Sequence, residues 1–399
     1  MTISSMTSTF YDLFSQTSWD ETAAAICAVT PAEVERALSR RGAGGLDDFR
    51  ALISPAAAGY LEPMACLSHE LTRQRFGNAV RLFAPLYLSN ECQNVCDYCG
   101  FSMSNNIPRK TLASAEILAE TSCLQGQGFE HILLVTGEAS RTVGVPYLRE
   151  ALRSLRPHFA NLSMEVQPLS QEDYESLIAE GLHAVLVYQE TYHPGSYRRH
   201  HPKGKKSNLR WRLETPDRLG AARIKKIGLG CLYGLTDNWR TDAFFTALHL
   251  DYLERRYWRS TYSMSFPRIR PHEGQAAPET YVHDSDLVQL LCAFRIFDHE
   301  LELTLSTRES PVFRDRAFRL GVTTMSAGSR TEPGGYASAE AEKNLEQFSI
   351  SDERSPAEIA AMLAAAGYEP VWKDWDAAYD CHVPIKKPAN EVRPLELVS

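Results

Sequence analysis

The chain has 399 residues, of which 44% are hydrophobic and 23% are charged, a composition typical of a globular protein that argues against disorder. Its length suffices for one large barrel or for two to three smaller domains. The 42 Lys and Arg residues against 50 Asp and Glu residues leave a net charge of −8, which excludes a generally basic surface, so we expect no nucleic-acid partner.

The first residues carry no targeting pattern. No Lys or Arg precedes Arg36, and acidic residues lie early, whereas a secretory leader starts basic and a mitochondrial leader is rich in Arg and poor in acids. The longest apolar stretch, residues 359–368, is well short of the roughly 18 residues that a membrane span needs. We therefore expect a cytoplasmic protein that contacts no membrane.

Residues 1–80 are predicted to form a helical N-terminal extension. Thr30 and Glu33 form a capping box with Pro31 at the first helical position, which predicts a helix start. A second helical pattern over residues 68–76 ends at Gly77, a common residue after a helix. No strand pattern appears before residue 80.

Residues 81–335 alternate short β-rich runs with helix-like segments. Eight strands are expected, at residues 86–88, 131–135, 162–166, 184–188, 227–232, 261–266, 301–305 and 322–325. That number of strand–helix units is typical of an α/β fold, the parallel (β/α)8 barrel of TIM type, although a doubly wound open sheet is the alternative. The pattern loosens over residues 336–399, which we expect to form a C-terminal cap and a tail.

Three cysteines lie in the loop after the first expected strand. Cys92, Cys96 and Cys99 have Cys-x3-Cys-x2-Cys spacing, which lets three thiolates converge on one soft-metal centre. Structural zinc sites usually take two cysteine pairs, and no second pair exists here. Three ligands therefore suggest a [4Fe–4S] cluster with one open iron. Three buried structural thiols are the weaker alternative, because barrel active sites lie beyond the carboxyl ends of the strands.

This cysteine spacing, with Tyr98 before the last cysteine, resembles the radical S-adenosylmethionine enzymes. The resemblance implies that the three cysteines hold one [4Fe–4S] cluster, that S-adenosylmethionine chelates its open iron, and that reduction yields a 5′-deoxyadenosyl radical. Longer motifs resemble the ThiH family, the tyrosine lyases (2-iminoacetate synthases) of thiamine thiazole synthesis. These motifs are residues 99–105, 134–138, 164–168, 188–193, 203–206, 211–218, 305–310 and 370–376.

The family resemblance implies a lyase that breaks the Cα–Cβ bond of L-tyrosine to give 2-iminoacetate (dehydroglycine) and 4-cresol. S-adenosylmethionine would be cleaved to 5′-deoxyadenosine and methionine. The implied partners are thiazole synthase (ThiG), which would receive the imine, and a flavodoxin-type or other low-potential reductant. Two other classes stay open: a lyase acting on another aromatic amino acid such as tryptophan, and a non-catalytic metal-binding scaffold.

The resemblance also implies contacts to S-adenosylmethionine at the strand ends. A carboxylate suits the methionine amine, and a guanidinium fork matches the methionine carboxylate. Glycines permit close approach of the backbone, although packing inside a barrel strand is the alternative for the pair in the fifth strand. The expected set is Tyr98, Gly137, Glu138, Glu165, Arg212, Gly228 and Gly230.

The implied substrate contacts are Arg308, Ser326 and Glu190. Arg308 resembles the arginine that binds the substrate carboxylate in aromatic amino-acid lyases, and an ion pair with Glu309 is the alternative. Ser326 would add a hydroxyl to the same carboxylate, and Glu190 would lie near the sugar or the substrate. Residues 198–212 carry seven Lys or Arg, a run that we interpret as a solvated loop rather than a nucleic-acid site.

The other six cysteines are scattered and are interpreted as small hydrophobic residues. The hydrogenase-maturation relative that also cleaves tyrosine carries a second cysteine cluster near its C-terminus. Here Cys381 stands alone in that region, so we expect a single cluster.

Overall fold

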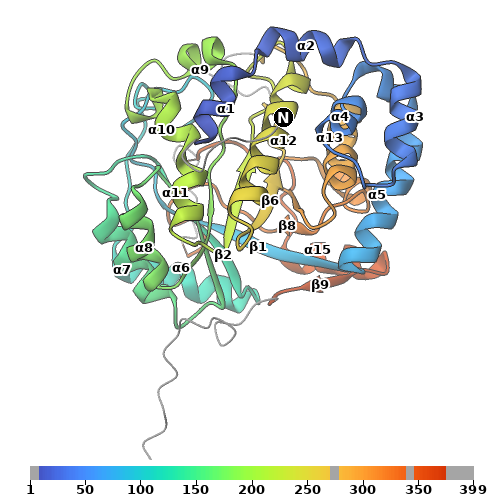
Figure 1. The fold of residues 1–399 in the computed structure, drawn as a ribbon. Helices are drawn as coiled ribbons and strands as arrows, with labels where there is room; N and C mark the ends of the chain where they lie inside the picture. Colours follow the sequence, from blue (N-terminus) through green and yellow to red (C-terminus); the bar gives the residue numbers. More distant parts are fainter. Residues whose placement is uncertain (1–8, 270–277, 338–345, 374–399) are drawn as a thin grey trace, which may run out of the picture.

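The computed structural model describes residues 9–269, 278–337 and 346–373, and eight of its parallel strands close into a barrel (Figure 1). The strands pair in the order β2-β3-β4-β5-β6-β7-β8-β1, and β1 pairs again with β2. The predicted (β/α)8 barrel is therefore confirmed, and the open-sheet alternative is wrong. The barrel strands are β1 (Ala79–Ser89), β2 (His131–Thr136), β3 (Asn161–Glu165), β4 (Leu182–Leu186), β5 (Lys226–Gly230), β6 (Thr261–Ser265), β7 (Glu302–Leu305) and β8 (Thr324–Ser326).

Strand β1 begins at Ala79, seven residues earlier than the sequence pattern predicts. Arg81 interrupts the apolar run, but this side chain points into the barrel and pairs with Glu302. Lys226 donates to the same carboxylate over 2.7 Å. The amino-terminal end of the barrel interior is therefore filled by paired charges, which satisfy one another away from water and conceal the strand in the sequence.

Helices surround the barrel, and the longer ones bury apolar side chains toward it. In α7, for example, Leu148, Ala151, Leu152 and Leu155 are buried, the spacing of a single helical face. No helix in the described ranges combines the length and the apolar character needed to cross a membrane. The helices after β1 are α6 (Ser114–Gly126), α7 (Val145–Leu155), α8 (Gln171–Ala179), α9 (Pro194–His200), α10 (Leu209–Leu213), α11 (Thr215–Ala221), α12 (Trp239–Arg256), α13 (Asp284–Phe297), α14 (Pro311–Ala317) and α15 (Pro356–Ala365), with the 3-10 turn η2 (Lys205–Ser207).

The helices before the barrel lie over α12 and α13 (Figure 1). Phe10 of α1 stacks on His249 of α12, with 3.7 Å between the ring centroids. The capping box at Thr30 is formed, because the Glu33 carboxylate accepts a hydrogen bond from the Thr30 N–H over 2.8 Å. These elements are α1 (Phe10–Gln16), α2 (Trp19–Cys27), α3 (Pro31–Ser39), α4 (Leu46–Leu52), η1 (Pro55–Tyr60) and α5 (Leu61–Phe76).

Residues 346–352, which we call the C-terminal strap, lie at the end of the barrel where the strands finish. The backbone N–H groups of Ser351 and Asp352 both donate to the carbonyl oxygen of Thr307, just after β7. Asp352 is fully buried and pairs with Arg314 of α14, which is also fully buried. After α15, the unexpected strand β9 (Glu369–Val371) pairs with the start of β1. Its central residue is Pro370, which suits an edge strand but gives no strand pattern.

Because both partners are buried, we expect the Asp352→Asn variant to lose about 3–5 kcal/mol of unfolding free energy, since Arg314 keeps a charge without its anion. Urea unfolding followed by circular dichroism measures this loss. Asp47→Asn is the matched control, because Asp47 pairs with Arg50 while its side chain is 85% exposed, and its loss should stay below about 1 kcal/mol. Equal losses in the two variants would contradict the assigned role of the buried pair.

Candidate active site

A deep cavity opens at the carboxyl ends of the barrel strands, and most of the predicted site residues line it. Loops after β1, β2, β4 and β7 all contribute, as expected for a barrel of this type. Gly228 and Gly230 do not line it, so their expected contact with adenine stays a prediction. The predicted residues on the cavity wall are Cys92, Cys96, Tyr98, Cys99, Gly137, Glu138, Glu165, Glu190, Arg212, Arg308 and Ser326.

The three predicted cysteine ligands face this cavity without converging on one point. Across the described residues, no three His, Cys, Asp or Glu side chains gather closely enough to hold a single metal ion. A [4Fe–4S] cluster takes each thiolate on a different iron, so separated thiols on one wall suit it better than a mononuclear metal. Burial raises the pKa of the Cys96 thiol, and it raises that of Cys99 to about 11. A cluster held by these thiols would therefore have to displace their protons.

Gly137, at the end of β2, lets the cysteine loop pack against the barrel. A Cβ at this position would lie 2.2 Å from the carbonyl oxygen of Glu91 and 3.2 Å from the Cβ of Cys92. The loop is then held by a hydrogen bond from the Gln93 N–H to the carbonyl oxygen of Glu138 (2.9 Å). Gly137 thus has a packing role in addition to the close approach to a ligand that the sequence suggests.

The two glycines of β5 also make close contacts. A Cβ at Gly228 would lie 2.5 Å from the Cγ of Leu186, and one at Gly230 would lie 2.6 Å from the carbonyl oxygen of Ser265. This agrees with the packing alternative for a glycine in a barrel strand.

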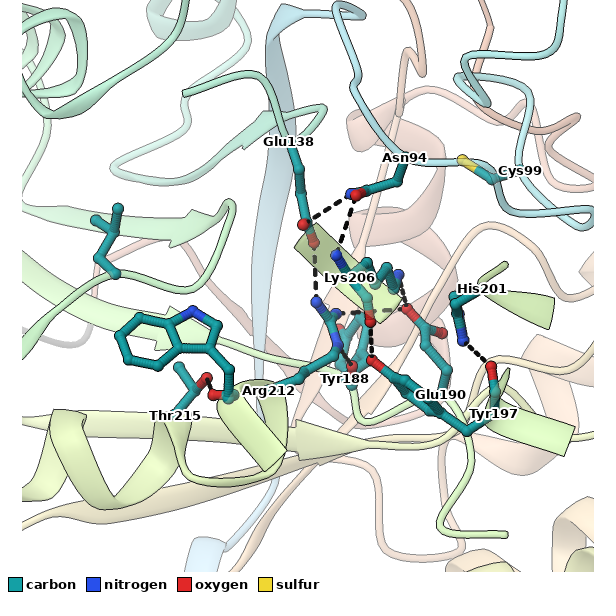
Figure 2. Close-up of polar contacts among 12 residues, drawn as sticks. Asn94, Cys99, Glu138, Tyr188, Glu190, Tyr197, His201, Lys206, Arg212 and Thr215 are labelled. Atoms are coloured by element: carbon teal, nitrogen blue, oxygen red, sulfur yellow. Dashed lines mark hydrogen bonds and ion pairs between the residues drawn. The ribbon is translucent and has the colours of Figure 1, made fainter. Parts of the chain in front are cut away.

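Figure 2 shows Arg212 between the carboxylates of Glu138 and Glu190, which follow β2 and β4. Its Nη1 donates to Glu138 Oε1 over 2.9 Å, its Nε donates to the carbonyl oxygen of Tyr188 over 2.7 Å, and its Nη2 lies 3.5 Å from Glu190 Oε1. The side chain of Arg212 is 8% exposed. A desolvated guanidinium needs such partners, because an isolated buried charge is costly.

Lys206 also belongs to this charged group, although the sequence analysis treats its basic run as a solvated loop. Its Nζ donates to Glu190 Oε1 over 2.6 Å. Burial favours the neutral form of Glu190, but Lys206 and Arg212 outweigh it and hold the pKa of Glu190 below its ordinary value. In the sequence, the only signal for an inward turn at Lys206 is the glycine of the motif, Gly204. In the structure Gly204 has a φ of +99°, and a Cβ there would lie 2.2 Å from Asn94 Oδ1.

Asn94, a second residue that the sequence analysis missed, connects the cysteine loop to both charged segments. Its side-chain oxygen accepts from the Lys206 N–H over 3.0 Å, and its Nδ2 donates to Glu138 Oε2 over 2.8 Å (Figure 2). In the same region the Tyr98 hydroxyl lies 2.7 Å from His201 Nε2. The position of Asn94 inside the cysteine motif is the signal that could have found it.

Glu190 points into the cavity from a strained backbone. Its φ is +71°, a left-handed conformation that is unusual for a residue with a side chain. Buried Asp242 of α12 accepts hydrogen bonds from the Tyr192 N–H (2.7 Å) and the Thr191 hydroxyl (3.0 Å). Burial raises the pKa of Asp242 to about 7. These contacts hold the turn that directs Glu190 inward, as expected where strain persists at a functional site.

Two ionisable groups of the cavity, Glu165 at the end of β3 and Arg308 after β7, have no ionic partner among the described residues. Glu165 forms no hydrogen bond or ion pair there, and burial raises its pKa to about 7. The Arg308 guanidinium lies 3.4 Å from the ring centroid of Phe348. Glu309, the alternative partner of Arg308, pairs instead with Arg268 over 2.5 Å. The Arg308 fork is thus available for an anion.

Ser326 presents a hydroxyl to the same cavity. Its Oγ accepts a hydrogen bond from the Thr307 N–H over 3.0 Å, which leaves the hydroxyl proton for a further acceptor. The cavity therefore holds carboxylates and cations from several strand ends beside an apolar wall. This combination suits ligands that carry both an amine and a carboxylate. The apolar wall consists of Phe83, Tyr87, Phe101, Leu133 and Val135.

Comparison with known proteins places two families along the chain. Residues 86–246 match the Radical SAM superfamily, and residues 265–369 match the Biotin and Thiamin Synthesis associated domain. The chain is 54% identical over 369 residues to the 2-iminoacetate synthase of Escherichia coli (strain K12), covering 92% of this chain and 97% of that protein. It is 53% identical to the same enzyme of Salmonella typhimurium over 92% and 97% of the two chains.

Among solved structures, the crystal structure of HydG, a maturase of the [FeFe]-hydrogenase, superposes with a TM-score of 0.83 at 27% identity. The superposition covers 91% of this chain and 80% of the HydG chain. The similarity therefore includes the helices before the barrel and the segment after it, as well as the barrel itself.

We expect the Gly137→Ala variant to hold less iron after anaerobic reconstitution, because its Cβ would displace Glu91 and Cys92. Iron and sulfide per chain are the measurement, and circular dichroism checks the fold. Gly126→Ala is the matched control, because a Cβ there meets no atom within 4 Å. Iron content equal to that of the control would contradict the packing role of Gly137.

Proposed function

This chain belongs to the 2-iminoacetate synthase family of radical S-adenosylmethionine enzymes, and on that basis we propose that it cleaves the Cα–Cβ bond of L-tyrosine. The products are 2-iminoacetate and 4-cresol, and S-adenosylmethionine is converted to 5′-deoxyadenosine and methionine. The observation that carries this proposal is the 54% identity to a 2-iminoacetate synthase over 92% of the chain. A non-catalytic scaffold is disfavoured, because perturbed and unpaired charges in a cavity are typical of functional sites.

We propose that Cys92, Cys96 and Cys99 hold one [4Fe–4S] cluster. The cluster, when bound, supplies the electron that cleaves the sulfonium of S-adenosylmethionine and so generates the 5′-deoxyadenosyl radical. A single cluster is supported by the cysteine count, because Cys381, which lies outside the described residues, is the one cysteine after Cys292. One cysteine cannot replace the set that a second cluster needs.

The charged group around Arg212 supports a binding site for the methionyl part of S-adenosylmethionine. In this proposal the ligand carboxylate takes the guanidinium of Arg212, and the ligand amine takes the carboxylate of Glu138. The ligand therefore replaces each partner of the Glu138–Arg212 ion pair with a group of the same charge. Lys206 and Glu190 keep their own pair, so the local charge balance survives binding. Tyr98, Gly137, Glu165, Gly228 and Gly230 complete the proposed contacts to this cosubstrate.

The opposite side of the cavity supports a site for the amino-acid substrate. Arg308 would bind the α-carboxylate through its fork, and Ser326 would donate its hydroxyl to the same group. Glu190, the third proposed substrate contact, lines the same cavity with its Oε1 3.5 Å from Arg212 Nη2. The apolar wall that includes Phe101 and Leu133 offers an aromatic ring a dry surface. Fixing the substrate in this way orients its amine, from which we propose that the radical removes hydrogen.

The product imposes constraints on partners and location. An imine hydrolyses in water, so we propose direct transfer to thiazole synthase (ThiG). The electron would come from a flavodoxin-type or other low-potential reductant. We place the reaction in the cytoplasm, where reducing conditions keep the cysteine ligands as thiols.

Anaerobic turnover with L-tyrosine, S-adenosylmethionine and dithionite tests the proposed function. We expect 4-cresol and 5′-deoxyadenosine in equal amounts, measured by liquid chromatography. Cys96→Ala should hold no cluster and form neither product, whereas Cys123→Ala, which alters a cysteine of α6, should behave as the unmodified protein. Consumption of tryptophan but not tyrosine would favour the alternative lyase, and a normal iron content in Cys96→Ala would contradict the ligand assignment.

Arg308→Lys should separate the two products. Lysine keeps the charge but loses the two-pronged geometry, so cosubstrate cleavage continues while the substrate amine is misplaced. We expect 4-cresol to fall far below 5′-deoxyadenosine in single-turnover assays. Arg319→Lys is the control, because Arg319 is exposed and lies against Phe318 outside the cavity. A product ratio unchanged from that of the unmodified protein would exclude Arg308 as the carboxylate anchor.

A further inference from the structure

The C-terminal strap touches the cysteine loop directly. The Gly100 N–H donates to the carbonyl oxygen of Gln347 over 3.0 Å, and the Gln347 N–H donates to the carbonyl oxygen of Thr331 over 3.0 Å. A Cβ at Gly100 would lie 2.5 Å from the carbonyl oxygen of Glu346. Gly100, directly after Cys99, therefore allows the strap to approach the cysteine loop this closely, whereas any residue with a side chain would clash.

The side chain of Gln347 reaches the sulfur of Cys99. Its Nε2 lies 3.9 Å from Cys99 Sγ, and its Oε1 accepts a hydrogen bond from the Tyr87 hydroxyl over 2.7 Å. An amide has one accepting end and one donating end. Because the phenol donates to the oxygen, the NH2 group is the end that faces the thiol sulfur.

We propose that Gln347 is a positioning residue for the cluster, whose amide N–H donates to the Cys99 thiolate and raises the reduction potential of the [4Fe–4S] centre. Reduction adds negative charge to the cluster and its sulfur ligands. A donor aimed at a ligand sulfur stabilises the reduced state more than the oxidised state, and such hydrogen bonds tune cluster potentials. This inference rests on the proposed cluster ligation by the three cysteines.

The strap holds this donor in place from both sides. On one side Gln347 is bonded through its backbone to Gly100 and Thr331. On the other, Asp352 is fixed by the buried ion pair with Arg314 and by its N–H bond to Thr307. A donor held in advance costs little further ordering when the cluster changes charge. The segment beyond the barrel thus contributes to the electron-accepting properties of the barrel loop.

The same strap contacts the proposed substrate anchor. Phe348, the next residue, lies on the guanidinium of Arg308. The chain bends at Gln347 and Phe348 and both side chains line the cavity, so the strap can serve the cluster and the substrate site with adjacent side chains. Changes at Gln347 should therefore affect the cluster, and changes at Phe348 should affect the hold on the substrate.

The test is a redox titration of the anaerobically reconstituted protein without S-adenosylmethionine, followed by electron paramagnetic resonance. We expect Gln347→Leu to keep its iron and sulfide but to have a more negative midpoint potential. The expected change is about tenfold in the ratio of reduced to oxidised cluster at a fixed potential, which is about 59 mV for one electron. Gln74→Leu is the matched control, because Gln74 bonds Glu70 on the exposed face of α5.

Gln347→Glu is the second variant, because it keeps the side-chain length and replaces the donor with a carboxylate that opposes reduction. Its midpoint should lie at least as low as that of Gln347→Leu. Unchanged potentials in both variants with full iron content would overturn the inference, and so would loss of iron from both, which would assign Gln347 to holding the loop. An unmodified protein that binds no iron would instead overturn the proposed function.

Discussion

The buried charge of Arg212 has to be paired, and this constraint arranges the part of the site around it. Arg212 can lie in the interior because Glu138 and Glu190 accept its hydrogen bonds. Glu190 in turn reaches it from a left-handed backbone that buried Asp242 helps to hold. Two residues of the basic run, Lys206 and Arg212, turn inward, where carboxylates of the cavity accept their hydrogen bonds. The cysteine loop is fastened to this group through Asn94.

The strap after the barrel imposes the second constraint. Arg314 and Asp352 are both fully buried, so the segment cannot leave the barrel without exposing a buried pair of charges or leaving one of them alone. As a result Gln347 and Phe348 stay beside Cys99 and Arg308 respectively. The family match over residues 265–369 covers this segment. The region beyond the eighth strand therefore contributes Gln347 and Phe348 to the wall of the cavity.

Sequence reasoning predicted what local patterns encode. Repeated strand–helix units predicted the barrel, and cysteine spacing after the first strand predicted which loop lines the cavity. Residues whose position depends on distant partners were missed. The Lys206 side chain turns inward to pair with Glu190, 16 residues earlier in the chain, and Gln347 lies 248 positions from the cysteine that it faces. The start of β1 was missed for the same reason. Arg81 is a charged residue in an otherwise apolar run, and its partner Glu302 lies far away in the sequence.

Arg212 and Arg308 of the cavity differ in their ion pairing, and this difference supports two separate proposed ligand sites. Arg212 is already satisfied, so an incoming carboxylate must exchange with Glu138, and only a ligand that also carries an amine can satisfy the displaced acid. Arg308 has a stacked aromatic ring but no carboxylate partner within the described ranges. A carboxylate that reaches it therefore gains a charge-assisted bond without breaking one. In the proposed arrangement the methionyl zwitterion replaces both charges of the preformed pair, and the substrate carboxylate meets Arg308 without displacing an acid.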